Sequence, residues 1–158
     1  MRRVLVANRG EIAVRVVRAC FDEGLECVVA VSAVDKDSLW ARMADDVVVI
    51  GPAPASESYL SVERIVAAAL HAGCDALHPG YGFLSERPEL AEACEENGLT
   101  FIGPPGDVMR RSGDKLQARE VADKLGIPIG GGTAGLASLD EALVAAENLD
   151  AYPLLMKA

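Results

Sequence analysis

The sequence predicts an α/β fold built on a doubly wound parallel sheet. Short runs of apolar and β-branched residues alternate with longer amphipathic segments about five times in roughly the first hundred residues, which is typical of parallel strands joined by helices. The strand-like runs are also continuously apolar, as expected for strands that helices cover on both faces. Right-handed crossover connections follow from this order of elements.

The first predicted strand covers residues 3–7 and is followed by a helix over residues 11–23. Gly24 ends that helix, and its apolar residues recur at helical spacing, namely Ile12, Val16, Ala19 and Cys20. A second strand over residues 27–31 is apolar throughout, as expected for a parallel strand that is covered on both faces.

A short helix over residues 37–44 and a third strand over residues 46–50 come next. Asp35 and Asp37 are both candidate caps for the short helix, because a carboxylate accepts the free N–H groups of a first turn. The segment 51–56 is rich in proline and is predicted to be a loop.

Ser61 is predicted to cap the next helix, which runs to His71 and ends at Gly73. Arg64 occupies the position where a capping box needs Glu or Gln, so the box is incomplete. The remaining elements of this part are a strand over 74–77, a helix over 88–97 and a strand over 99–102.

The alternation stops after residues 103–105, and we place a domain boundary near residues 103–112, giving domains 1–110 and 111–158. The second part contains predicted helices over 107–112, 114–125 and 138–148. Ser138 caps the last helix, with Glu141 at the capping-box position. A new strand is expected over residues 153–158.

Composition excludes several classes of function. The 158 residues contain 15 Lys and Arg against 24 Asp and Glu, a net charge of −9, which argues against a nucleic-acid binder and against docking on anionic lipid. Aromatic residues make up 4%, too few for a platform that stacks single-stranded nucleic acid. No apolar run reaches the ~18 residues that span a bilayer, and the N-terminus lacks the pattern of a signal peptide.

The four cysteines show no C-x-x-C spacing, and the chain has two histidines, so we predict no metal site. We interpret the cysteines as reduced thiols packed like small apolar side chains, in a cytoplasmic protein.

Residues 8–11 form a tight turn between the first strand and the first helix. A dinucleotide-binding fold would place G-x-G-x-x-G here, but Gly10 is the only glycine, so the NAD fingerprint is absent. The spacing alone favours a structural turn, with Glu11 well placed at the positive end of the helix.

Residues 78–86 follow the end of a strand, where open α/β sheets bind their ligands. The segment is therefore either part of a binding site or a packing element in which Tyr81 and Phe83 cover the sheet edge and Ser85 caps the next helix. His78 is a candidate general base, and a hydrogen-bonded structural histidine is the competing interpretation.

Two lysines and a glycine run are candidate phosphate contacts. Lys115 lies near the start of a predicted helix, where a solvated lysine is the alternative. Lys157 lies in an apolar strand, where a lysine needs a phosphate or carboxylate partner. Residues 130–132 are three glycines without the Gly-Lys-Ser/Thr that completes a P-loop, so a plain connecting loop is favoured.

Arg18 and Asp22 stand four residues apart on one face of the first predicted helix. They form either an exposed ion pair or part of a self-complementary dimer surface.

Five segments occur together in an order that resembles the N-terminal part of biotin carboxylase. They are Val6–Ala13, Ile50–Pro54, His78–Glu86, Phe101–Pro104 and Gly113–Lys115, and the similarity extends over essentially the whole chain. The resemblance implies a Rossmann-like domain that precedes the beginning of an ATP-grasp domain.

The resemblance also implies an activity: carboxylation of biotin on a carrier domain by ATP and bicarbonate through carboxyphosphate, with Mg²⁺ or Mn²⁺ on the phosphates. Lys115 and Lys157 match the family's ATP-binding lysines, and the first helix, with Arg18 and Asp22, matches its dimer surface. The expected partners are the biotin carboxyl carrier domain and a carboxyltransferase subunit of an acyl-CoA carboxylase that acts on acetyl-CoA or propionyl-CoA.

The family's glycine-rich ATP lid, metal-binding carboxylates and biotin-binding residues have no counterpart in the sequence. We therefore assign no catalytic residue and no metal ligand within the chain, and we expect a fragment that is inactive by itself. Two alternatives are another ATP-grasp ligase, such as carbamoyl-phosphate synthetase, and a Rossmann-like module that mediates association without catalysis.

Overall fold

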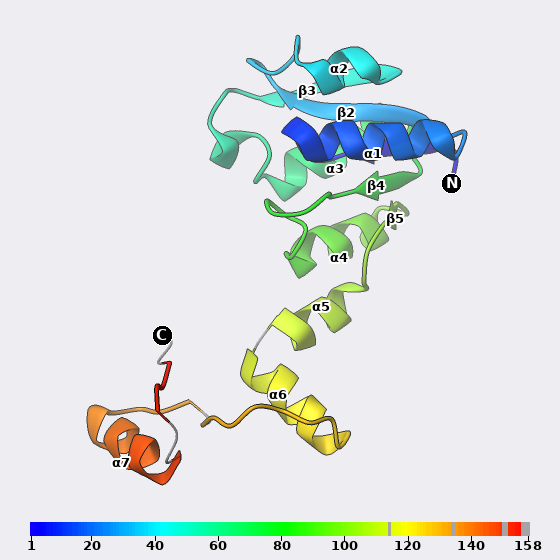
Figure 1. The fold of residues 1–158 in the computed structure, drawn as a ribbon. Helices are drawn as coiled ribbons and strands as arrows, with labels where there is room; N and C mark the ends of the chain where they lie inside the picture. Colours follow the sequence, from blue (N-terminus) through cyan, green and yellow to red (C-terminus); the bar gives the residue numbers. More distant parts are fainter. Residues whose placement is uncertain (114, 134, 150–151, 156–158) are drawn as a thin grey trace. The chain divides into compact units, whose positions relative to one another are not determined.

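A computed structural model describes residues 1–113, 115–133, 135–149 and 152–155, apart from the side chains of residues 115 and 116. The chain divides into two compact units, Met1–Arg110 and Arg111–Ala158 (Figure 1).

The first unit contains five parallel strands in the order β3-β2-β1-β4-β5. The strands are β1 (Arg3–Val6), β2 (Glu26–Ser32), β3 (Asp46–Gly51), β4 (Ala76–His78) and β5 (Thr100–Phe101). The chain builds β2 and β3 on one side of β1 and then crosses to build β4 and β5 on the other side. This reversal between β1 and β4 is the switch point of a doubly wound sheet, as the sequence predicted.

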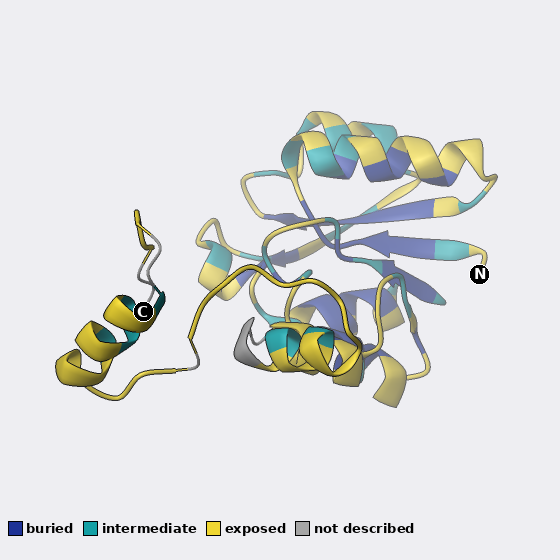
Figure 2. Ribbon diagram, turned by 60° about the horizontal axis from the view of Figure 1, so that its bottom comes forward, coloured by how far each residue is buried: buried dark blue, intermediate teal, exposed yellow. Residues whose placement is uncertain are grey.

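Helices cover both faces of this sheet. The helices are α1 (Gly10–Asp22), α2 (Leu39–Met43), α3 (Val62–His71) and α4 (Pro88–Glu96), with a short 3₁₀ turn, η1, at Ala55–Glu57. The residues of α1 and α2 share one apolar cluster with the strands, and those of α3 and α4 share another. Figure 2 shows the resulting buried layer along the strands.

Alternate strand residues supply these two clusters. Val4 and Val6 pack toward α1, whereas Leu5 between them packs toward α3. In β2, Val28 and Val29 likewise face opposite sides, and both are fully buried. The continuous apolar runs in the sequence are therefore explained by burial on both faces.

The predicted helix caps in the first unit were partly correct. Ser61 caps α3, because its Oγ accepts from Arg64 N at 3.3 Å. Neither Asp35 nor Asp37 caps α2, which begins after Ser38 without a side-chain cap, and Ser85 does not cap α4, whose N-cap position is held by Arg87. These three predictions were wrong. Asp35 instead accepts hydrogen bonds from the hydroxyls of Ser32 and Tyr59.

The second unit contains α6 (Lys115–Lys124) and α7 (Leu139–Leu149), while α5 (Gly106–Gly113) spans the boundary between the units. Ser138 Oγ accepts from Glu141 N at 3.2 Å, which confirms the predicted cap of α7. Glu141 reaches back to Ala137 N rather than to the cap residue itself.

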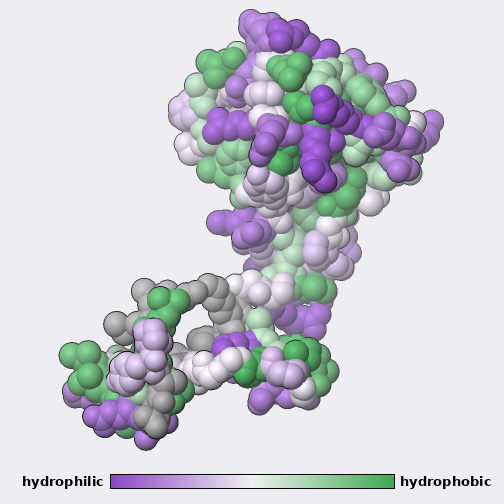
Figure 3. Space-filling model, in the orientation of Figure 1, coloured by the Kyte–Doolittle hydropathy of each residue, from purple (hydrophilic) through white to green (hydrophobic). Residues whose placement is uncertain are grey.

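No described residue of the second unit is buried, and α7 exposes Leu139, Leu143 and Val144. Figure 3 shows hydrophobic atoms, in green, among hydrophilic ones on the surface of this unit. The predicted strand at 153–158 is not present over residues 153–155, and residues 156–158 lie outside the described part of the chain.

Candidate functional site

The two loop motifs that the sequence singled out meet at the switch point of the sheet. Residues 8–11 follow β1 and residues 78–86 follow β4, and these two strands are neighbours. Ala7 N donates to His78 O at 2.9 Å, so the strands remain paired up to the start of both loops. Because ligands of open α/β sheets bind at the carboxyl edge beside such a reversal, this edge is the candidate site in the first unit.

Asn8 joins the two motifs through its buried side chain. Its Nδ2 donates to Pro79 O at 2.7 Å and to Tyr81 O at 2.9 Å, while its Oδ1 accepts from Arg9 N at 2.9 Å. The residue is 4% exposed, so these hydrogen bonds have no competition from water. The sequence predicts a structural turn over residues 8–11, but the role of Asn8 was not predicted. Its signal in the sequence is a polar residue directly after a buried strand.

The loop that Asn8 holds has an unusual backbone. Gly80 and Gly82 have φ of +66° and +65°, and Phe83 has φ of +45°. Residues other than glycine rarely adopt this backbone conformation. A Cβ on Gly80 would lie 2.6 Å from Asn8 Nδ2 and 2.8 Å from Ile12 Cγ2, whereas a Cβ on Gly82 would meet open space. Gly80 is therefore required both for its conformation and for the close approach of Asn8.

An aromatic stack supports Phe83. Its ring lies against the ring of Tyr59, with centroids 5.3 Å apart and planes 8° from parallel. The Arg9 guanidinium carbon lies 5.2 Å from the centroid of Phe83 and 5.7 Å from that of Tyr59. This stack links the turn after β1 to the loop after β4, and a cation over an aromatic face adds roughly 0.5–1 kcal/mol where exposed.

Tyr59 is itself fixed by polar contacts at the end of β2. Its hydroxyl donates to Asp35 Oδ2 at 2.7 Å and accepts from Ser32 N at 3.0 Å, and Ser32 Oγ donates to the same carboxylate oxygen at 2.6 Å. Burial raises the pKa of Tyr59 to about 12, so it remains a hydrogen-bond donor at neutral pH. These contacts thus connect the carboxyl ends of the adjacent strands β2, β1 and β4.

Tyr81 and Phe83 have different environments. Phe83 is half-buried on Tyr59, but Tyr81 is 64% exposed and its hydroxyl donates to Glu11 Oε1 at 3.3 Å. The expectation that both rings cover the sheet edge is therefore wrong for Tyr81. An exposed aromatic ring on a fixed loop at the carboxyl edge is available to contact a ligand.

His78 adopts a structural hydrogen bond. Its Nδ1 accepts from Gly80 N at 3.0 Å, which requires the unprotonated form of that nitrogen. The side chain is half-buried, and this burial lowers the pKa of His78. The contact fits the structural interpretation of His78, since Nδ1 is engaged within the loop.

The predicted phosphate contacts fall mostly outside the described atoms. Lys115 is the first residue of α6, but its side chain is not among those described, and Lys157 lies outside the described residues. Residues 130–132 form no regular element, and Arg119 Nη2 donates to Gly130 O at 2.8 Å. Both lysines therefore stay predicted phosphate contacts.

Arg18 and Asp22 are both exposed on α1, and within the described part of the chain no ion pair joins them. Their side chains remain available on the surface of the helix. Of the two interpretations of this pair, the exposed ion pair does not form, and the dimer surface stays a prediction.

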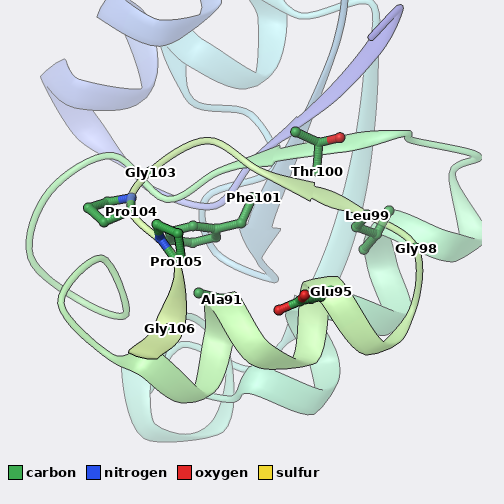
Figure 4. A pocket seen from close by; sticks show the side chains of 10 residues that line it. All are labelled: Ala91, Glu95, Gly98, Leu99, Thr100, Phe101, Gly103, Pro104, Pro105 and Gly106. Atoms are coloured by element: carbon green, nitrogen blue, oxygen red, sulfur yellow. The ribbon is translucent and has the colours of Figure 1, made fainter. Parts of the chain in front are cut away.

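A shallow pocket of about 340 Å³ lies at the β5 edge of the first unit (Figure 4). Its lining comes from the end of α4, from β5 and from the segment that follows β5: Ala91, Glu95, Gly98, Leu99, Thr100, Phe101 and Gly103–Gly106. No sequence pattern predicted this pocket, and its lining contains none of the predicted site residues.

Among the described residues, no three His, Cys, Asp or Glu side chains are grouped so as to hold a metal ion. Within the same residues, no helix is long and apolar enough to cross a membrane.

Comparison with known proteins gives the family. Residues 1–109 match the family model described as "Biotin carboxylase, N-terminal domain". The chain belongs to the biotin carboxylase family. It is 46% identical over 158 residues to biotin carboxylase 1 of Bacillus subtilis and 44% identical over 163 residues to biotin carboxylase of Haemophilus influenzae. These alignments cover 100% of this chain but 35% and 36% of the relatives, so the chain spans about a third of their length.

Solved structures agree with this assignment to biotin carboxylases. The biotin carboxylase domain of a thermophilic 2-oxoglutarate carboxylase bound to bicarbonate has a TM-score of 0.88 at 44% identity, over 99% of this chain and 35% of that one. The biotin carboxylase subunit of a pyruvate carboxylase has a TM-score of 0.81 at 45% identity, over 95% and 33%. The predicted fold class, a Rossmann-like parallel sheet followed by the start of an ATP-grasp domain, is confirmed.

Gly80→Ala is expected to destabilise the first unit more than Gly82→Ala. Both changes impose about 1–2 kcal/mol for a left-handed backbone, and Gly80→Ala adds roughly 1–3 kcal/mol for the clash with Asn8 and Ile12. Urea denaturation followed by circular dichroism measures the difference. Equal losses in the two variants would show that the close approach of Asn8 does not constrain this position.

Acidification is expected to destabilise the loop through His78. Because the pKa of His78 is lower in the folded chain than the ordinary 6.5, the unfolded chain binds more protons, and stability falls as pH drops below about 6.5 toward the folded value. His78→Asn keeps an acceptor for Gly80 N but does not titrate, so the fall between pH 7 and pH 5 becomes smaller than in the parent. His71→Asn, at the other and exposed histidine, is the control and leaves the fall unchanged.

Proposed function

We propose that the chain forms the N-terminal part of an enzyme that carboxylates biotin with ATP and bicarbonate. The observation that carries this proposal is the match of residues 1–109 to the N-terminal domain of biotin carboxylase, together with identity of 44–46% across the whole chain to two enzymes of that name. In this reaction ATP activates bicarbonate as carboxyphosphate, and the carboxyl group passes to N1 of biotin on a carrier domain.

The two units have different proposed tasks. Residues 1–110 form the Rossmann-like domain that backs the active site, and residues 111–158 begin the ATP-grasp domain. The rigid carboxyl edge around Asn8 fits the task proposed for residues 1–110. A loop that is fixed by buried hydrogen bonds presents Tyr81 without a cost of ordering on binding.

Lys115 and Lys157 are proposed to bind the phosphates of ATP. Two ammonium groups would neutralise part of the charge on the triphosphate, which is the main requirement of phosphoryl transfer. The resemblance to biotin carboxylase is the basis on which we assign the ligands of Mg²⁺ or Mn²⁺, which would neutralise phosphate charge, to another part of the enzyme. The biotin- and bicarbonate-binding residues are assigned there as well, and the 158 residues alone are expected to be inactive.

The proposed final acceptor is an acyl-CoA, such as acetyl-CoA or propionyl-CoA, and the partners are a biotin carboxyl carrier domain and a carboxyltransferase subunit in the cytoplasm. The relatives also include one of the subunits of the pyruvate carboxylase of Methanothermobacter thermautotrophicus, at 45% identity over 99% of this chain and 32% of that one. The choice of acceptor is therefore proposed to lie in the carboxyltransferase.

A chimaera tests this function. Residues 1–158 replace the matching 158 residues of Bacillus subtilis biotin carboxylase 1, and bicarbonate-dependent release of phosphate from ATP and carboxylation of free biotin are measured. The chimaera is expected to be active and the isolated chain inactive. Lys115→Ala and Lys157→Ala each lower kcat/KM for ATP roughly 10- to 100-fold, as expected for loss of a charged contact.

Lys124→Ala is the matched control, since Lys124 lies on α6 with Lys115 and is exposed. It is expected to leave kcat/KM unchanged. A folded chimaera without activity would favour a non-catalytic association module, and unchanged kinetics in both lysine variants would remove the proposed ATP contacts.

We also propose that α1 forms a homodimer surface that includes Arg18 and Asp22. One structural neighbour, the biotin carboxylase domain of Hydrogenobacter thermophilus 2-oxoglutarate carboxylase, is described as a dimer, at a TM-score of 0.87 and 44% identity over 93% of this chain and 32% of that one. Arg18→Glu is expected to weaken self-association in analytical ultracentrifugation, whereas Arg87→Glu, at an exposed arginine before α4, leaves it unchanged. An unaltered association constant in Arg18→Glu would exclude this surface.

A further inference from the structure

The arginine that ends the first unit binds a carboxylate of the preceding helix. Arg110 lies in α5 and is the last residue of the first unit, and Glu92 lies in α4. Arg110 Nε donates to Glu92 Oε1 at 2.8 Å, and Arg110 Nη2 donates to Glu92 Oε2 at 2.5 Å. The planar guanidinium thus binds both carboxylate oxygens, which fixes an orientation as well as a distance. The same hydrogen bonds lower the pKa of Glu92 and raise that of Arg110, so both groups are charged at neutral pH.

A second carboxylate extends this contact along α4. Glu89 precedes Glu92 by three residues, and its Oε1 lies 4.0 Å from Arg110 Nη1. The other oxygen of Glu89 accepts from Arg87 Nε at 3.3 Å. An isolated ion pair at a surface contributes little, but bidentate geometry and a network of charges are the exceptions. We call Arg110, Glu92 and Glu89 the Arg110 network.

Two further residues of α5 hold the helix in the first unit. Gly106, its first residue, is buried, and a Cβ there would lie 2.6 Å from Glu92 Cγ. Gly106 and Arg110 are four residues apart, so they lie on one face of α5, and both contact Glu92. Met109 is 8% exposed and adds a buried apolar side chain. The start of α5 is therefore fixed on α4 by a close approach and by the Arg110 network.

Lys115 follows this fixed part of α5 closely in the chain. Residues 111–113 complete the helix and are exposed, and Lys115 is the first residue of α6. Three helical residues advance the chain by about 5 Å, and two more span at most about 7 Å, so the Cα of Lys115 stays within about 12 Å of the Cα of Arg110. A fixed Arg110 therefore restricts the positions that Lys115 can take.

We propose that Arg110 is a positioning residue, which holds α5 on α4 through Glu92 and Glu89 and so restricts Lys115. This inference rests on the proposed function, in which Lys115 binds the phosphates of ATP. Arg110 does not itself contact ATP in this proposal. With the Arg110 network intact, the beginning of α6 is restricted before ATP binds. Without the network, ATP must bind and order this segment together, which weakens the apparent affinity.

Hydrogen exchange in the 158-residue chain tests the network without any activity. Met109 N donates to Pro105 O at 3.0 Å, so the Met109 amide reports on the first turn of α5. In Arg110→Gln this amide is expected to exchange at least about fivefold faster, while the amides of β1 keep their protection. Arg42→Gln, at an exposed arginine of α2, is the matched control and leaves the exchange of Met109 unchanged.

Exchanging the two charges separates the ion pair from the packing of either side chain. Arg110→Glu and Glu92→Arg each bring like charges together, so each is expected to accelerate exchange at Met109. The double variant restores an opposite-charge pair and is expected to return the exchange rate to within about twofold of the parent. Losses that simply add in the double variant would exclude the ion pair as their cause.

Kinetics of the Bacillus subtilis chimaera test the link to ATP. Arg110→Gln is expected to raise KM for ATP about 3- to 10-fold and to leave kcat within about twofold, because only the ordering before binding is lost. The double charge exchange is expected to restore KM, and Arg42→Gln leaves KM and kcat unchanged. A general folding defect would have the opposite signature, since less active enzyme lowers kcat and leaves KM as it is.

The outcomes distinguish this inference from the proposed function. An active chimaera in which Arg110→Gln leaves KM for ATP unchanged overturns the inference alone. Unchanged exchange at Met109 in Arg110→Gln overturns it as well, because the network would then not hold α5. A folded chimaera without activity overturns the proposed function and, with it, the role of Arg110 toward ATP.

Discussion

The buried amide of Asn8 is the contact on which the carboxyl edge of the sheet depends. One side chain donates to two carbonyls of the loop after β4 and accepts from the backbone of the turn after β1. Pro79 O and Tyr81 O have no equivalent partner if that amide is lost, and a buried carbonyl without a donor costs about 1–3 kcal/mol. Glycine at position 80 follows from this contact, because only a residue without Cβ lets the loop approach the amide.

Other contacts at the carboxyl edge hold the loop after β4 in the same conformation. Gly80 N is used by His78, the ring of Phe83 rests on Tyr59, and Tyr59 is tied through its hydroxyl to Ser32 and Asp35 at the end of β2. Positive φ at Phe83 is a strained state that persists because these contacts over-determine it. The result is a preformed surface from which Tyr81 projects, at the edge where open α/β sheets bind their ligands.

The sequence predicted the sheet well because its signal is repeated. Each strand is a continuous apolar run, each helix has one apolar face, and glycines end three of the helices, so neighbouring elements support the same fold. Strand ends were less exact: β4 was expected at residues 74–77 and lies at Ala76–His78, since hydrogen bonding to β1 rather than apolarity decides where a strand stops.

The site was predicted only in part, for physical reasons. The importance of residues 78–86 could be read from their glycines, but the role of Asn8 depends on carbonyls some seventy residues away in the chain, which no local pattern encodes. Asp35 likewise resembled a helix cap, yet two hydroxyls that are brought to it by the fold are better partners. Cys20 and Cys27 were interpreted as small apolar residues, and both are indeed buried in the apolar cluster between α1 and the sheet.

Hydrogen exchange in Asn8→Asp tests the central contact most directly. The change is nearly isosteric, but it replaces the donating amide with a carboxylate that faces two carbonyl oxygens. The account predicts that the amides of Gly80 and Ser85, which donate to His78 Nδ1 and Gly82 O, exchange at least about tenfold faster, while those of β1 and β2 keep their protection. Unchanged protection of Gly80 and Ser85 in a folded variant would contradict it.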